Sequence, residues 1–116
     1  MTCVDINKML LNAIPEVGNA FYAFANTQDG LNTGCHMVFE KVLLPFTMEA
    51  LDKGYTNVLK WIFYLIEDMA NSDDEYIEEI ATLSFIGMLK PLYDNSDELI
   101  PYMESRTYYL YDTLTL

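Results

Sequence analysis

The stretch that decides the fold is WIFYLIEDMANSDDEYIEEIATLSFIGML, residues 61–89. Its two ends are apolar with little polar interruption, and its middle reads SDDE at 72–75. A Ser followed three residues later by Glu is the capping-box signature of a helix start. The stretch therefore predicts two helices joined by a tight turn, the second running from the SDDE phrase to about Lys90, where Pro91 stops it.

Towards the N-terminus, apolar side chains recur every three or four residues, as in amphipathic helices. One such stripe covers residues 6–17, with Asp5 as its expected N-terminal cap and Pro15 as its end or kink. The stretch TQDGLNTG at 27–34 has loop composition, and its two glycines are free to take positive φ.

A second helical pattern covers residues 36–53. Pro45 lies inside it and predicts a kink or a helix that restarts there. Glu49 and Lys53 are four residues apart and are expected to pair on the outer face. Gly54 is the expected C-terminal cap.

The helix that opens at Thr56 has one narrow polar stripe, and Trp61 falls on its apolar side. The stripe consists of Lys60, Tyr64, Glu67, Asp68 and Asn71. A helix with so thin a polar face is expected to be covered by neighbours from several sides. From Leu83 to Leu89 the next helix is apolar nearly all round, which predicts a central element.

The C-terminal part predicts one further helix. Ser96 is its expected cap, with Asp97 and Glu98 in its first turn. The end of the chain, YYLYDTLTL at 108–116, either finishes this helix or runs as an extended tail.

These patterns together predict an all-α fold. The chain has 116 residues and is 52% hydrophobic, enough for one compact domain spanning residues 1–116 and too short for two. We expect five or six short helices in antiparallel pairs because the connections are short, and a HEAT-like curve is one way to stack them.

The charge of the chain limits its partners. Acidic residues outnumber basic residues 18 to 6, for a net charge of −12. Phosphate contacts need Lys and Arg, so nonspecific nucleic-acid binding is excluded and binding to an anionic membrane surface is disfavoured. The sequence has no run of eighteen apolar residues, so no membrane span is expected. The N-terminus lacks the basic region of a secretion signal, so we expect a cytoplasmic protein.

Motifs for catalysis or cofactor binding are absent from the sequence. It has no glycine-rich phosphate loop, CxxC, HExxH or EF-hand spacing, so we expect no cofactor, no metal and no enzyme activity. Cys3 and Cys35 are interpreted as two thiols in preference to a disulfide, because cytoplasmic disulfides are rare. His36 lies beside Cys35, which by itself does not indicate a nucleophile. A hydrolase with paired carboxylates is the enzyme alternative.

The acidic residues are concentrated in one segment. Residues 67–79 hold seven acids and no base, and the chain divides into −3 over residues 1–56 and −9 over the rest. Such a cluster is either a solvated face or a surface that meets a basic partner. On the second interpretation, the predicted partner-binding residues are Glu67, Asp68, Asp73, Asp74, Glu75, Tyr76, Glu78 and Glu79. In this set Tyr76 would be the aromatic anchor, because Tyr offers a large contact area and one polar tip.

The chain resembles a family of small, acidic, all-helical bacterial proteins of unassigned activity. The family phrase is an aromatic-rich helix, a Ser-Asp-Asp-Glu turn, an apolar helix and a Tyr-Met pair. The residues that carry the resemblance are Phe63, Glu67, Met69, Ala70, Ser72, Asp73, Asp74, Glu75, Tyr102 and Met103.

Some proteins of this kind resemble immunity proteins of contact-dependent growth-inhibition and other polymorphic toxin systems. The resemblance implies that this chain binds and neutralises a cognate toxin domain. A basic nuclease is the partner that the acidic charge favours, because nucleases need cationic surfaces for their substrates. The alternative is a helical interaction adaptor unrelated to toxins.

Overall fold

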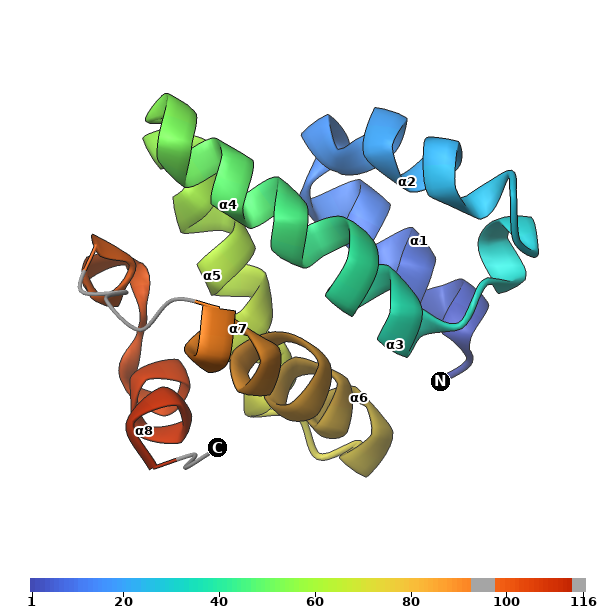
Figure 1. The fold of residues 1–116 in the computed structure, drawn as a ribbon. Coiled ribbons are helices and arrows are strands. Elements are labelled where there is room, and N and C mark those ends of the chain that lie inside the picture. The colour runs from blue at the N-terminus through green and yellow to red at the C-terminus, as the bar shows by residue number, and fades with distance from the viewer. Residues whose placement is uncertain (93–97, 114–116) are drawn as a thin grey trace.

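Helix α5 (Thr56–Ala70) lies at the centre of the fold in a computed structural model that describes residues 1–92 and 98–113 (Figure 1). It contacts elements from both ends of the chain. They include α1 (Cys3–Ala13), α4 (Leu44–Lys53), α6 (Glu75–Glu79) and α8 (Ser105–Thr113). A HEAT-like stack would bring α5 into contact with its sequence neighbours only, whereas here the helices form one globule around α5.

The all-α prediction is confirmed. Counting continuous runs as one, the described residues form six helices and no strand. The remaining helical elements are η1 (Pro15–Val17), α2 (Gly18–Ala25), η2 (Gly30–Asn32), α3 (Cys35–Val38), η3 (Phe39–Leu43), η4 (Ile80–Ile86), α7 (Gly87–Leu92) and η6 (Ile100–Tyr102). Two long rods, α3–η3–α4 and α6–η4–α7, each pass through a π-helical segment, η3 and η4 respectively.

The hydrophobic core joins α5 to the rods on either side. Phe63 of α5 and Phe85 of η4 are fully buried and pack edge to face, with ring centroids 5.9 Å apart. The radius of gyration is 13.1 Å, close to the roughly 13 Å expected of a compact chain of this length. Among the described helices, none combines the length and the apolarity needed to cross a membrane.

Helix α1 starts three residues earlier than the sequence predicts. Thr2, and not Asp5, is the N-cap. The Asp5 backbone N–H donates to Thr2 Oγ1 at 3.2 Å, and the Thr2 backbone N–H donates to Asp5 Oδ2 at 3.1 Å. This reciprocal pair is the capping box, and the Thr2 backbone hydrogen bond lowers the pKa of Asp5.

The capping box predicted at 72–75 is wrong by two residues. Asp74, and not Ser72, caps α6, and its Oδ1 accepts from the backbone N–H of Tyr76 at 2.9 Å and of Ile77 at 3.3 Å. The Ser72 hydroxyl accepts from the backbone N–H of Asp74 at 3.1 Å. Because Ser72 closes this local turn, the first helical turn begins only after Asp74.

The predictions around Pro45 are confirmed. The rod passes from the π-helical η3 into α4 at Leu44, with Pro45 in the first turn of α4, where it removes one backbone donor. Lys53 donates to Glu49 Oε1 at 2.7 Å. Gly54 ends α4 with φ of 73°, in the left-handed region.

Gly54 and Gly18 form a matched pair for a stability test. Gly54→Ala should lower the free energy of unfolding by about 1 kcal/mol, because a Cβ is strained at positive φ. Gly18→Ala should raise it by about 0.5–1 kcal/mol, because Gly18 has φ of −54° in α2 and a Cβ there meets no atom within 4 Å. Urea denaturation measures both, and equal shifts would contradict the backbone argument.

Two side chains predicted to be buried are exposed. Trp61 is 44% exposed and Leu83 is 56% exposed. The sides of α5 and η4 on which they lie are left open, because the neighbouring helices cover the other sides. Among the loop glycines, only Gly30 takes a positive φ, and Gly34 precedes α3 with φ of −53°.

The last helix begins later than predicted. A short 3-10 turn, η6, comes first, and α8 then runs from Ser105 to Thr113, so the first part of the aromatic end is helical. The predicted cap Ser96 and the following Asp97 lie outside the described residues.

The two cysteines form a disulfide, which corrects the expectation of two thiols. The first residues of α1 and α3 lie side by side, and the Cα atoms of Cys3 and Cys35 are 5.2 Å apart. Cys35 is fully buried, and its backbone N–H donates to Cys3 Sγ at 3.3 Å. The bond ties α1 to the rod that begins with α3.

Candidate partner-binding surface

The predicted acidic residues lie on the end of α5, the turn that follows it, and α6. Exposed side chains in this set are Asp68, Asp73, Glu75 and Glu79, while Asp74 and Glu78 are half-buried. We call these six residues the acidic segment. The rod α6–η4–α7 packs beside α5, so the acidic segment lies at one end of this pair (Figure 1).

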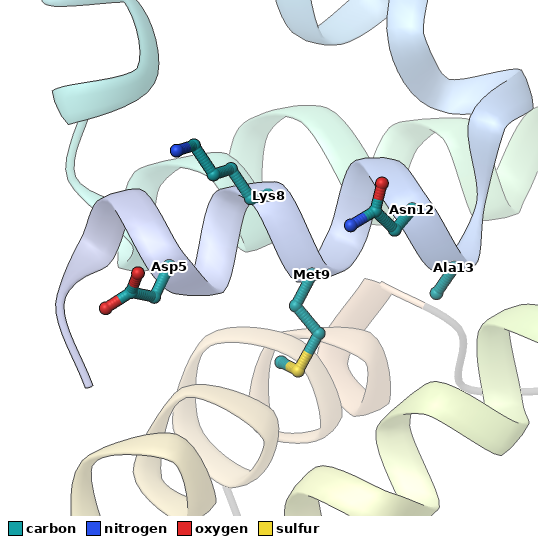
Figure 2. A pocket seen from close by; sticks show the side chains of 5 residues that line it. All are labelled: Asp5, Lys8, Met9, Asn12 and Ala13. Atoms are coloured by element: carbon teal, nitrogen blue, oxygen red, sulfur yellow. The ribbon is translucent and has the colours of Figure 1, made fainter.

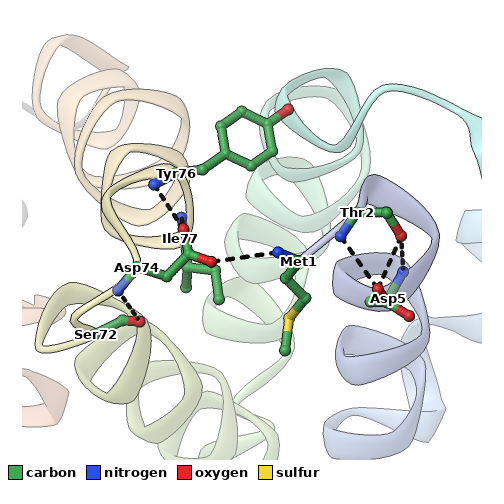
Figure 3. Close-up of polar contacts among 7 residues, drawn as sticks. All are labelled: Met1, Thr2, Asp5, Ser72, Asp74, Tyr76 and Ile77. Carbon is green, nitrogen blue, oxygen red and sulfur yellow. Dashed lines mark hydrogen bonds and ion pairs between the residues drawn. The ribbon is translucent and has the colours of Figure 1, made fainter.

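The charge of the acidic segment is almost unneutralised. Within residues 1–92 and 98–113, one ion pair reaches it, from the Met1 amino group to Asp74 Oδ2 at 3.4 Å (Figure 3). The other five carboxylates have no cation within ion-pair distance in that part of the chain. The surface therefore carries a concentrated negative potential.

Asp74 has a structural role beside any binding role. Its hydrogen bonds from Ile77 and Tyr76 start α6 (Figure 3), and the first of these is the main reason that the pKa of Asp74 is lowered. A substitution at Asp74 would disturb the helix start as well as the charge. Asp73 and Glu79 are exposed without such bonds, so they report on charge alone.

Glu67 lies apart from the other predicted site residues. It is only 8% exposed, and its Oε1 accepts from the Thr107 backbone N–H and hydroxyl, each at 2.8 Å. Its Oε2 accepts from the Arg106 backbone N–H at 3.2 Å and from Asn71 at 2.9 Å. Glu67 thus holds the first turn of α8 and is not available to a partner.

The pKa of Glu67 reflects these contacts. Burial alone would raise it, but the hydrogen bonds from Thr107, Asn71 and Arg106 together outweigh burial and lower the pKa below the ordinary 4.5. The carboxylate therefore stays ionised at neutral pH and supplies negative charge at the N-terminus of α8, where the helix dipole favours it.

Tyr76 points into the fold and not freely outward. Its hydroxyl lies 3.3 Å from Cys3 Sγ and 3.4 Å from Cys35 Sγ, and its ring packs edge-on against His36 at 5.5 Å. The residue remains 37% exposed. Tyr76 covers the disulfide, so a partner can reach only the exposed part of its ring.

His36 also makes a contact that the sequence did not indicate. Its Nδ1 forms a short hydrogen bond with the Ser84 hydroxyl, which links α3 to η4. Ser84 is buried. Neither residue lines any of the hollows described below.

Exposed aromatic residues extend the surface along α5. Trp61 and Tyr64, which is 51% exposed, share one helix face with Asp68 because they are spaced three and four residues apart. Tyr64 belongs to the polar stripe predicted from the sequence and is one of the aromatic residues near the acidic cluster, whereas Trp61 was expected on the covered side. Tyr108 and Tyr109 of α8 are also exposed, and the Arg106 guanidinium lies 5.4 Å from the centre of the Tyr109 ring.

Three hollows lie near these residues. The first, which we call the α1–α5 groove, has a volume of about 300 Å³ and is lined by Met9, Ala13, Leu65, Asp68, Met69, Ser72 and Ile77. A shallower hollow on α1 continues from it and is lined by Asp5, Lys8, Met9, Asn12 and Ala13 (Figure 2). The third is lined by Lys60, Tyr64, Pro101, Tyr102, Met103 and Glu104.

The described residues contain no group of three or more His, Cys, Asp or Glu side chains arranged to hold a metal ion.

Tyr102, which lines the third hollow, is half-buried and stacks on Phe63, with ring centroids 6.5 Å apart. The surface is thus built from carboxylates, exposed aromatic rings and a partly apolar groove.

Fold and surface define a small all-helical protein with an acidic, partly aromatic face. The chain belongs to the family described as domain of unknown function DUF7674, whose model matches residues 7–115. This agrees with the expected family of unassigned activity, and the match carries no link to immunity proteins. Neither the curated proteins nor the solved structures contain a match to the chain.

Proposed function

We propose that this protein is an immunity protein that binds a basic bacterial toxin domain and blocks it. The observation that carries the proposal is the acidic segment, six carboxylates of which five have no ion-pair partner in the described chain. Lys and Arg that a nuclease uses for phosphate can pair with these carboxylates through charge-assisted hydrogen bonds. The mechanism is occlusion, with no bond made or broken by this chain.

The neighbouring exposed side chains support binding over mere solubility. A charged face that serves solubility needs no aromatic rings, yet Trp61 and Tyr64 lie on the same side of α5 as Asp68. Trp, Tyr and Arg dominate the energetic centres of protein interfaces. The carboxylates would accelerate the encounter, and the rings would slow dissociation.

Growth protection tests the proposal. The chain is co-expressed with the product of the adjacent open reading frame, and growth is scored. We expect the natural chain to protect, and the double variant Asp73→Lys/Glu79→Lys to lose protection, with affinity for the purified toxin falling about tenfold or more. Raising the salt from about 0.05 M to about 0.5 M should weaken binding of the natural chain markedly.

The control keeps the same change in net charge elsewhere. Asp29 and Asp52 are also exposed, and Asp29→Lys/Asp52→Lys should protect as well as the natural chain. If both double variants protect equally, the acidic segment is not the contact face. If the natural chain neither binds nor protects, the immunity function is wrong and an adaptor function takes its place.

A further inference from the structure

The α1–α5 groove is the feature of this surface that the acidic charge alone does not explain. Leu65, Met69 and Ile77 form a floor that is nearly buried, whereas Met9 is half-buried and Ala13 is exposed. Figure 2 shows Met9 and Ala13 pointing from α1 towards the neighbouring helices. The groove is therefore an apolar hollow that one further side chain can enter.

The charges at the groove are mostly negative. Asp68 is its one charged lining residue, is exposed, and has no ion pair in the described chain. Asp73 follows the lining residue Ser72, and Asp5 lies one turn before Met9. Lys8 is the single basic residue lining the adjoining hollow. An occupant with positive charge next to an apolar group is the chemistry that fits.

We propose that the groove binds an apolar side chain of the toxin, flanked by Lys or Arg residues that pair with Asp68 and Asp73. This inference rests on the proposed function and names the segment of the partner that it recognises. A second copy of this chain is a poor occupant, because each copy carries a net charge of −12 and the two acidic faces would repel. An anionic lipid or nucleotide meets the same repulsion.

The apolar contact and the charged contacts contribute differently to binding. Burial of one Leu- or Met-sized side chain in the groove should account for about 10- to 100-fold in affinity. The flanking charges orient the segment and set the encounter rate. An apolar peptide without Lys or Arg, or a basic peptide without the apolar side chain, should therefore bind much more weakly than a peptide with both.

Methionine-methyl NMR locates the occupant directly. The probe is a synthetic helical peptide of Leu, Lys and Ala in which Leu recurs every three or four positions, and the full-length chain carries ¹³C-methyl methionine. We expect the probe to shift the signals of Met9 and Met69, which line the groove, and to leave Met37 on α3 unchanged. A shift confined to Met103, which lines another hollow, would overturn the proposal.

A matched pair of alanines supplies the mutational test. Ala13→Arg fills the groove and adds a positive charge, while Ala23→Arg adds the same charge at an exposed position of α2. We expect Ala13→Arg to weaken binding of the probe about tenfold or more and Ala23→Arg to weaken it by less than about twofold. A second peptide with Ala in place of Leu should not distinguish the two variants.

The growth assay separates this inference from the function on which it rests. If the natural chain protects and Ala13→Arg protects equally well, the groove is not the anchor site, although the immunity function stands. If the probe shifts Met9 and Met69 but the chain never protects, the groove binds basic amphipathic segments and the immunity function fails. Equal loss of probe binding in both Arg variants would show that only overall charge matters and would overturn the groove proposal.

Discussion

Reduction of the Cys3–Cys35 disulfide should lower the free energy of unfolding by about 3–4 kcal/mol. The bond joins residues 32 positions apart and removes the freedom of that loop from the unfolded chain. It also fixes the start of α1 against the start of α3, under the ring of Tyr76. Urea denaturation with and without dithiothreitol, followed by circular dichroism, measures the difference.

The double variant Cys3→Ser/Cys35→Ser is the control for this measurement. It has no thiol, so its denaturation curve should be the same with and without reductant and should lie close to that of the reduced natural chain. If reduction leaves the midpoint of the natural chain in place, the disulfide does not contribute to stability. Circular dichroism is preferred to fluorescence because the only tryptophan, Trp61, is already 44% exposed in the folded state.

Glu67→Ala should lower the free energy of unfolding by about 3 kcal/mol. The substitution removes the acceptor for the backbone N–H groups of Arg106 and Thr107 and leaves the start of α8 without a partner. Asp68→Ala is the matched control, because the adjacent carboxylate is exposed and should change stability by no more than about 0.5 kcal/mol. Hydrogen exchange should show α8 opening first in Glu67→Ala, and equal effects of the two substitutions would contradict the assignment.

The pH dependence gives an independent check on Glu67. Its pKa in the folded chain is lowered, so its stabilisation is complete above the ordinary pKa of 4.5 and is lost as the pH falls through the folded value. The stability difference between the natural chain and Glu67→Gln should therefore shrink below about pH 4.5. The comparison of two chains cancels the general relief of repulsion that a net charge of −12 produces at low pH. A difference that does not change with pH would mean that Glu67 is not held as a carboxylate.

Apolar spacing was sufficient to predict the fold class and several helix ends. The stripe at 6–17, the restart near Pro45 and the cap at Gly54 depend on local rules, because a missing N–H or a positive φ constrains the chain wherever it lies. The positions of caps were less predictable. Ser72 and Asp74 both have capping side chains, and a single hydrogen bond decides which of them starts the helix.

Local rules of this kind could not predict the tertiary contacts. Glu67 was grouped with Asp68 because both are acidic, but residues adjacent on a helix point about 100° apart, and only one of them faces α8. Nothing near Glu67 in the sequence indicates that Thr107, 40 residues away, would meet it. The disulfide was not predicted for a related reason. The expectation of two thiols rested on the cellular compartment, whereas the packing of α1 on α3 decides whether the two cysteines meet. The exposure of Trp61 was not predicted, because the apolar side of a helix is usually covered by its neighbours and this one is open.

The two π-helical segments affect how relatives of this chain should be aligned. A π turn accommodates one residue more than an α turn, so η3 and η4 each absorb what would otherwise be an insertion. Removing one residue from either rod would let it wind as a regular α-helix, and the parts before and after that turn would keep their relative orientation. Since η3 and η4 lie against each other, a change of length in one rod would favour a compensating change in the other. In an alignment of the family, a single-residue gap at η3 should then be accompanied by a single-residue gap at η4.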